Sequence, residues 1–228
     1  MKVALIGSGA IGNWLSQRLD PKPYIVRRGD SLPPAAVVVE AAGHEALARY
    51  GVAALEQGSD LVIVSIGALA HDGLWRDLQA AAKRSKIILP AGAVAGIDAL
   101  SAARRGGLDE VFYSARKPPA SLSESLPVDR ETVLFEGNAR EAALRFPKNA
   151  NVAATIALAG LGFDATRVRI VADPTVSENI HELEVRGAFG SFTMSIAGRP
   201  LPANPKTSSL SAMSVLRCIE SRQSTIVV

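Results

Sequence analysis

Six residues near the N-terminus constrain the fold of this chain more than any other segment. An apolar run, Val3–Ile6, leads into Gly7-Ser8-Gly9-Ala10-Ile11-Gly12, and apolar residues then recur at helical spacing over Ala10–Leu19. Glycines at this spacing, between a buried strand and a helix, are typical of the fingerprint that binds the pyrophosphate of a dinucleotide. The alternative is a glycine-rich turn that serves packing only. The predicted phosphate-binding residues are Gly7, Gly9, Ala10, Ile11 and Gly12.

Short runs rich in Val and Ile alternate with helix-like stretches over the first 115 residues. This pattern predicts a parallel sheet covered on both faces, in a Rossmann-type α/β domain. The segment 27–36 holds two adjacent prolines and leaves no room for a crossover helix, so we expect a loop or a single turn there. The further strand candidates are Tyr24–Val26, Val37–Val39, Leu61–Ser65 and Lys86–Leu89.

The second half of the chain has a different order of predicted strands and helices. From about Asp109, strand-like runs such as Arg167–Ala172 mix with two helix-like stretches, and Gly187 and Gly190 indicate a hairpin. An amphipathic helix is expected over about 208–220. We therefore predict a dinucleotide-binding domain formed by residues 1–108 and 203–228, with an α+β catalytic and dimerisation domain, 109–202, inserted into it.

Two other segments bear on cofactor binding. An acidic residue normally follows the second strand and holds the ribose of NAD, but Arg27 and Arg28 stand there, which suits the 2′-phosphate of NADP. The alternative is that both arginines are solvated and Asp30 binds the ribose. Ser65, Gly67 and Ala68 follow the fourth strand, at the carboxyl edge where open α/β sheets bind ligands; tight helix–strand packing is the alternative.

Composition excludes several classes of protein. The chain of 228 residues carries 25 Lys and Arg against 22 Asp and Glu, and the small excess lies beyond residue 198, which is not the pattern of a nucleic-acid binder. One cysteine and three scattered histidines argue against a disulfide framework and a metal site. The uncharged stretches are too short to cross a membrane, so we expect no membrane partner and a cytoplasmic protein.

Several longer motifs, in order along nearly the whole chain, resemble the L-aspartate dehydrogenase family. They are GSGAIG, EAAGH, SIGAL, GAVAGIDALSAARRGGL, ARKP, FPKNANVAATIALAGLG, ADPTVSENIH and NPKTS. The resemblance implies a catalytic histidine at His181 and contacts of Ala93 and Asn151 with the nicotinamide of NADP or NAD. Without it, a lone histidine such as His181 is more often structural.

The resemblance also implies the reaction. L-Aspartate would be oxidised to iminosuccinate, which hydrolyses to oxaloacetate and ammonia. Iminosuccinate would feed pyridine nucleotide biosynthesis. The resemblance also implies a homodimer. His181 would exchange the proton of the amino group. The substrate-binding candidates in the same motifs are Lys148, Asn179, Lys206 and Thr207, with Arg116 and Lys117 as further cationic candidates.

Two alternatives stay open on the residues. The chain could be another NAD(P)-dependent imine or 2-keto-acid reductase of similar layout. It could also be a non-catalytic dinucleotide-sensing protein, which would need neither an acid–base residue nor cationic groups for two carboxylates.

Overall fold

The chain forms two compact units in a computed structural model that describes residues 1–122, 129–147, 150–202 and 204–226. The first unit combines Met1–Gly92 with Ser211–Val228, and the second is Ala93–Leu210. Residues 93–108 and 204–210, expected in the dinucleotide-binding domain, belong instead to the second unit.

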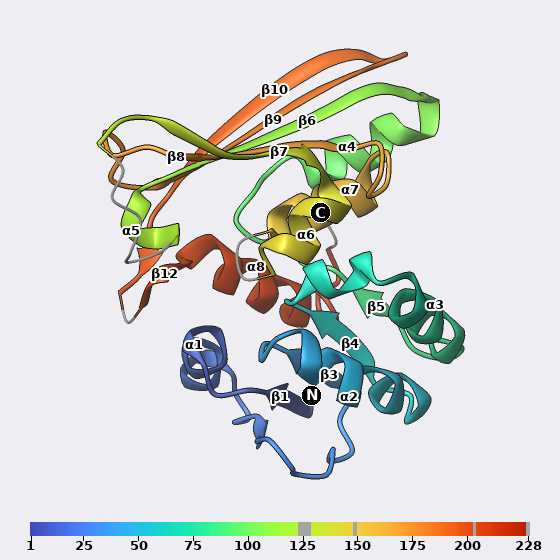
Figure 1. The fold of residues 1–228 in the computed structure, drawn as a ribbon. Helices are drawn as coiled ribbons and strands as arrows, with labels where there is room; N and C mark the ends of the chain where they lie inside the picture. Colours follow the sequence, from blue (N-terminus) through green and yellow to red (C-terminus); the bar gives the residue numbers. More distant parts are fainter. Residues whose placement is uncertain (123–128, 148–149, 203, 227–228) are drawn as a thin grey trace. The chain divides into compact units, whose positions relative to one another are not determined.

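The first unit is built on a five-stranded sheet in which every neighbouring pair is parallel (Figure 1). The strand order is β2-β1-β3-β4-β5, so the chain leaves β1 on one side and returns to pair with it on the other. This confirms the expected Rossmann-type sheet. Its strands are β1 (Val3–Ile6), β2 (Tyr24–Val26), β3 (Val37–Glu40), β4 (Asp60–Ile63) and β5 (Ile87–Ile88).

Apolar side chains bury both faces of this sheet. Alternate strand residues such as Val3 and Val39 pack with Leu15 of α1 and Val215 of α8. On the other face, Leu61 lies beside Gly51 of α2 and Leu78 of α3. The helices are α1 (Ala10–Arg18), α2 (His44–Glu56), η1 (Ile66–Ala70, a 3₁₀ helix), α3 (Asp72–Ala81) and α8 (Ser209–Glu220).

The connection from β2 to β3 contains no helix, as the adjacent prolines predict. Its first four residues, 27–30, form a turn in which Asp30 N–H donates to the carbonyl of Arg27 at 3.1 Å. The Asp30 carboxylate accepts the N–H of Arg27 at 2.8 Å and closes the same turn from the other side. The two arginines therefore sit on a defined turn directly after β2.

The second unit is a five-stranded mixed sheet with helices on one face (Figure 1). The order is β10-β9-β6-β8-β7, and only β6 and β8 are parallel. The predicted hairpin at Gly187 and Gly190 joins β9 to β10. The strands are β6 (Leu108–Lys117), β7 (Thr132–Asn138), β8 (Arg167–Ala172), β9 (Asn179–Gly187) and β10 (Gly190–Gly198).

The second unit also contains helices that pack on its sheet and on one another, and a short two-stranded sheet formed by β11 and β12. Helices α6 and α7 pack together, α7 contacts α4, and α6 contacts β7 and β8. The described helices include none that is long and apolar enough to cross a membrane. The bounds are α4 (Ile97–Ala103), η2 (Arg104–Gly106), α5 (Pro119–Leu122), α6 (Ala139–Arg145), α7 (Asn151–Ala159), β11 (Pro200–Leu201) and β12 (Asn204–Ser208).

Candidate functional site

The glycine-rich turn of the first unit has the geometry of a phosphate cradle. Gly7 has φ +103°, and a Cβ on it would lie 2.9 Å from the Cβ of Ala42. A Cβ on Gly12 would lie 2.3 Å from the carbonyl oxygen of Gly7, so only glycine lets α1 start so close to β1. A Cβ on Gly9, by contrast, meets no atom within 4 Å. Space is thus left open at the N-terminus of α1, where no side chain caps the free N–H groups.

A cavity of about 460 Å³ opens beside this turn. Arg27 and Arg28 line it, as does Arg49 from α2, which the sequence analysis did not single out. Arg28 approaches Glu45 at only 3.8 Å, and both side chains are more than 90% exposed, so this ion pair holds neither in place. Three arginines therefore line one cavity that Gly7 also lines.

Tyr50 holds the turn that carries Arg27 and Arg28. Its hydroxyl accepts the N–H of Gly29 at 3.3 Å and lies 3.1 Å from the carbonyl of Asp30 and 3.4 Å from that of Arg27. All three contacts are to backbone atoms. The turn is thus anchored without use of the arginine side chains.

Glu40, at the end of β3, is a buried carboxylate with 0% exposure. It accepts the N–H groups of Ala42 and Gly43 at 2.7 and 2.8 Å, and the N–H and hydroxyl of Ser65 at 3.1 and 3.0 Å. Burial raises the pKa of Glu40, while these four donors oppose that shift. Glu40 therefore ties the loop after β4 to the loop whose Ala42 packs on Gly7.

The predicted cofactor-binding residues after β4, which are Ser65, Gly67 and Ala68, lie in the loop and 3₁₀ helix that Glu40 contacts through Ser65. The backbone N–H and the hydroxyl of Ser65 both donate to Glu40. Gly67 and Ala68 are buried in η1. Their position is at the carboxyl edge of the sheet, as expected, and Ser65 holds the Glu40 carboxylate there.

In the second unit, His181 lies on the sheet face that the helices cover. It is 3% exposed, and its Nδ1 lies 2.7 Å from the Tyr113 hydroxyl. Lys117, on the same strand as Tyr113, is 6% exposed. Burial, and then the positive charge of Lys117, lower the pKa of His181 to about 3, and burial lowers the pKa of Lys117 to about 8. Burial raises the pKa of Tyr113, so that residue stays a phenol.

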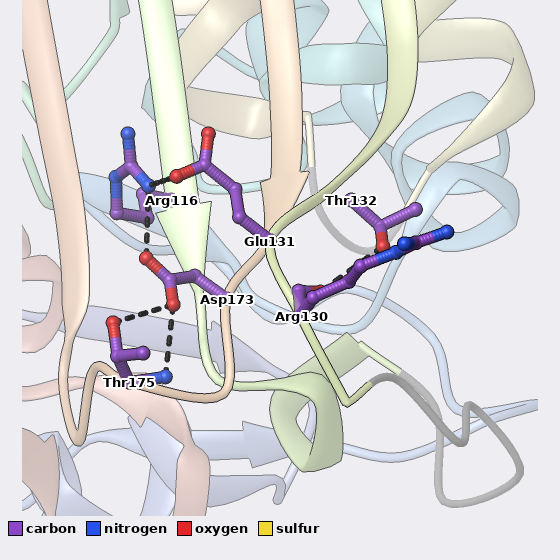
Figure 2. A network of polar contacts seen from close by, with 6 residues as sticks. All are labelled: Arg116, Arg130, Glu131, Thr132, Asp173 and Thr175. Atoms are coloured by element: carbon purple, nitrogen blue, oxygen red, sulfur yellow. Dashed lines mark hydrogen bonds and ion pairs between the residues drawn. The ribbon is translucent and has the colours of Figure 1, made fainter.

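Arg116 points to the opposite face from Lys117, because successive strand residues alternate. Figure 2 shows Arg116 between two carboxylates, those of Glu131 and Asp173, the latter at 2.8 Å. Asp173 also accepts the N–H and hydroxyl of Thr175 at 2.8 and 2.6 Å. These contacts anchor the segment that leads into β9 and His181.

The other predicted site residues of this unit are spread over several elements. Ala93 is buried, and Asn151 is the first residue of α7. Asn179 opens β9; its side-chain oxygen accepts the Ser121 hydroxyl at 3.1 Å, and both residues line a cavity of about 210 Å³. Thr207 is half-buried in β12. Lys148 and the side chain of Lys206 lie outside the described residues.

Comparison with known proteins connects this architecture to one family. Residues 98–222 match the family model described as aspartate dehydrogenase, C-terminal, and residues 16–90 match that of the homoserine dehydrogenase NAD binding domain. The L-aspartate dehydrogenase of Ralstonia pickettii is 43% identical over 261 residues, covering 97% of each chain. That of Ralstonia nicotianae is 54% identical over 196 residues, covering 82% of this chain and 73% of its own.

A solved structure agrees over the full length. The crystal structure of aspartate dehydrogenase from Thermotoga maritima matches with a TM-score of 0.86 and 32% identity, covering 100% of this chain and 99% of its own. Fold, motifs and relatives all agree. The chain belongs to the L-aspartate dehydrogenase family.

Proposed function

We propose that this protein is an NAD(P)-dependent L-aspartate dehydrogenase, which converts L-aspartate to iminosuccinate and, by hydrolysis, to oxaloacetate and ammonia. The observation that carries the proposal is the buried Tyr113–His181 pair with Lys117 beside it, in a chain of this family. A buried imidazole next to a buried amine is costly for stability, and such groups concentrate where proton transfer is needed.

The first unit supplies the cofactor site in this proposal. The turn formed by Gly7, Gly9 and Gly12 fits a pyrophosphate. A Cβ at Gly7 or Gly12 would collide with the protein itself, whereas the space beside Gly9 is open to a ligand. Arg27, Arg28 and Arg49 favour NADP, since guanidinium groups bind a 2′-phosphate through paired N–H donors. The Asp30 carboxylate is engaged with the Arg27 N–H, which weakens the alternative that it binds the ribose of NAD.

The second unit supplies the groups that handle the substrate. When bound, the nicotinamide accepts the hydride from the substrate Cα, and we assign its contacts to Ala93 and Asn151. Aspartate has two carboxylates and an ammonium group, which must lose a proton before the C–H bond can break. Of the neighbouring residues Arg116 and Lys117, we assign Lys117 to the substrate, as the group that binds a carboxylate or accepts a proton. Arg116 is paired with Glu131 and Asp173 on the other face of the sheet.

The finer parts of the proposal are a cytoplasmic homodimer and the use of iminosuccinate in pyridine nucleotide biosynthesis. Asn179 and Thr207, with Lys148 and Lys206, remain the candidates for the second carboxylate. Light scattering of the purified protein tests the dimer directly. A monomer at assay concentration would remove that part of the proposal and leave the chemistry untouched.

The test of the reaction follows the absorbance of reduced nicotinamide with oxaloacetate, with and without ammonium. Oxidation of NADPH or NADH that requires ammonium supports reductive amination and hence the proposed function. Oxidation without ammonium would point instead to a 2-keto-acid reductase, and tight cofactor binding without turnover to another imine substrate or a sensor.

The cofactor preference has its own test in the same assay. We expect Arg27→Ala and Arg49→Ala to weaken NADPH binding much more than NADH binding, because only NADPH carries the 2′-phosphate. Equal losses for both cofactors would contradict the assignment of the arginines to that phosphate.

A further inference from the structure

His181 is flanked on both sides by ionisable residues of β6. The register of β6 and β9 places Ala115 directly opposite His181 and Leu183 opposite Tyr113. Tyr113 and Lys117 therefore occupy the two diagonal positions around His181, on the same face, where long side chains reach across. From the other side, β10 places the apolar Ile196 opposite His181. Among the described residues, Tyr113 and Lys117 are the ionisable groups that face this imidazole from its paired strands.

The contact with Tyr113 decides which nitrogen of His181 carries the proton. Tyr113 is 1% exposed, and in the described part of the chain its hydroxyl has Nδ1 of His181 as its polar partner. If Nδ1 carried the proton and donated it to the phenol, the phenolic O–H would be left buried without an acceptor, which is costly. The ring planes are 9° apart and the ring centroids lie 6.1 Å apart, while the phenol oxygen lies 2.7 Å from Nδ1; the two rings therefore meet nearly end to end, with the in-plane lone pair of Nδ1 toward the phenol. The hydrogen bond is best satisfied when the phenol donates to Nδ1.

We propose that Tyr113 is a positioning residue that holds His181 as the neutral tautomer with its proton on Nε2, so that His181 donates a hydrogen bond to the substrate and the amine of Lys117 takes the substrate proton. This inference rests on the proposed function and deepens it. Two residues then share the work: Lys117 accepts the substrate proton, and His181 donates a hydrogen bond to the substrate. A neutral histidine with a lowered pKa serves other enzymes in the same way, as a hydrogen-bond donor.

In the oxidative step, one proton passes from the substrate to Lys117 and one hydride passes from the substrate to the nicotinamide. The substrate ammonium transfers one proton to the neutral Lys117 amine, which becomes an ammonium. The freed nitrogen lone pair forms the C=N bond as the Cα–H bond breaks, and that bonding pair leaves as hydride to the oxidised nicotinamide. With its pKa near 8, Lys117 is neutral in a useful fraction of molecules at mildly alkaline pH. His181 Nε2–H remains bonded to a substrate carboxylate and gains no proton.

Nitrogen NMR tests the tautomer without any substrate. The chain has three histidines, so isotope-labelled protein gives few imidazole signals, and the signal missing from His181→Gln identifies His181. We expect a neutral ring with the proton on Nε2 in the wild type, and a mixture of tautomers in Tyr113→Phe. Tyr24→Phe is the control, because Tyr24 is exposed. A proton on Nδ1 in the wild type would overturn the proposal.

Kinetics of the holoenzyme test the division of roles. We expect Lys117→Met and Lys117→Arg both to lower kcat about 10²–10⁴-fold, the usual contribution of a general base, because neither supplies a neutral amine. His181→Gln keeps a donor near the position of Nε2–H and should retain at least about tenfold more activity than His181→Leu, the change that one hydrogen bond makes. Equal activity of these two variants, or an active Lys117→Arg, would overturn it.

The two levels of the proposal can fail separately. If the wild type shows no aspartate-dependent turnover but His181 carries its proton on Nε2, the proposed function fails and the tautomer assignment stands. If turnover is present and His181 is protonated on Nδ1, the function stands and the role of Tyr113 is refuted.

Discussion

Replacing Glu40 by Gln tests whether a buried carboxylate organises the carboxyl edge of the first sheet. Oε1 of Glu40 accepts three donors and Oε2 accepts the Ser65 N–H. A glutamine can keep one oxygen where Oε1 lies, but its NH₂ group then faces the Ser65 N–H, donor against donor. With one buried N–H left unsatisfied and charge-assisted bonds weakened, we expect a loss of about 3 kcal/mol in unfolding free energy.

Thermal and denaturant unfolding measure this effect. For a chain of this size, a loss of about 3 kcal/mol lowers Tm by roughly 6–12 °C. Ser65→Ala removes one neutral donor and should lose about 1 kcal/mol. Glu56→Gln makes the same chemical change at an exposed position and should stay within about 0.5 kcal/mol of the wild type. If Glu40→Gln were no more destabilising than Ser65→Ala, the carboxylate would not be the organising group.

Four further substitutions test the glycine turn and the shifted pKa values of Asp173 and Lys117. Gly12→Ala should disrupt the start of α1, because its Cβ would meet the Gly7 carbonyl, whereas Gly9→Ala should leave Tm unchanged and weaken cofactor binding, which calorimetry would measure. Bonds from Thr175 and then Arg116 lower the pKa of Asp173, so its stabilisation is present above the ordinary value of 3.8 and lost as pH falls through the lowered one. Asp173→Asn should therefore lower Tm at neutral pH and match the wild type in strong acid. Burial disfavours the charged form of Lys117, so Lys117→Met should raise the free energy of unfolding at neutral pH by up to roughly 3 kcal/mol. The wild type should gain stability as pH rises from about 8 to 10.5, and the variant should not. The same dependence of Tm on pH in both proteins would contradict the lowered pKa.

The parts of the fold that depend on local pattern were predictable from the sequence. The strand run Val3–Ile6, the glycine turn and the helix at Ala10 follow from apolar periodicity and from glycines at fixed spacing. The missing crossover helix follows from two adjacent prolines. These features need no knowledge of distant residues.

The parts that depend on distant partners were not predictable. Tyr113 reads as an ordinary strand residue until the β6–β9 register brings it to His181. Glu40 begins the motif EAAGH, but its partner Ser65 lies on another loop. Strand alternation does separate Arg116 from Lys117, yet without the register it does not say which of them shares a face with His181. Arg49 lies on α2, and no local sequence pattern indicates that this helix lies close to the turn after β2.

The anchoring of the turn at residues 27–30 bears on how readily the cofactor preference proposed above can change by mutation. Tyr50 and Asp30 bond to main-chain atoms of the turn, so these contacts do not use the side chains at 27 and 28. Mutation can therefore explore these two positions at little structural risk. With Arg27 and Arg28 in the role proposed above, single substitutions there would shift the preference between phosphorylated and unphosphorylated dinucleotides and leave the anchoring of the turn in place.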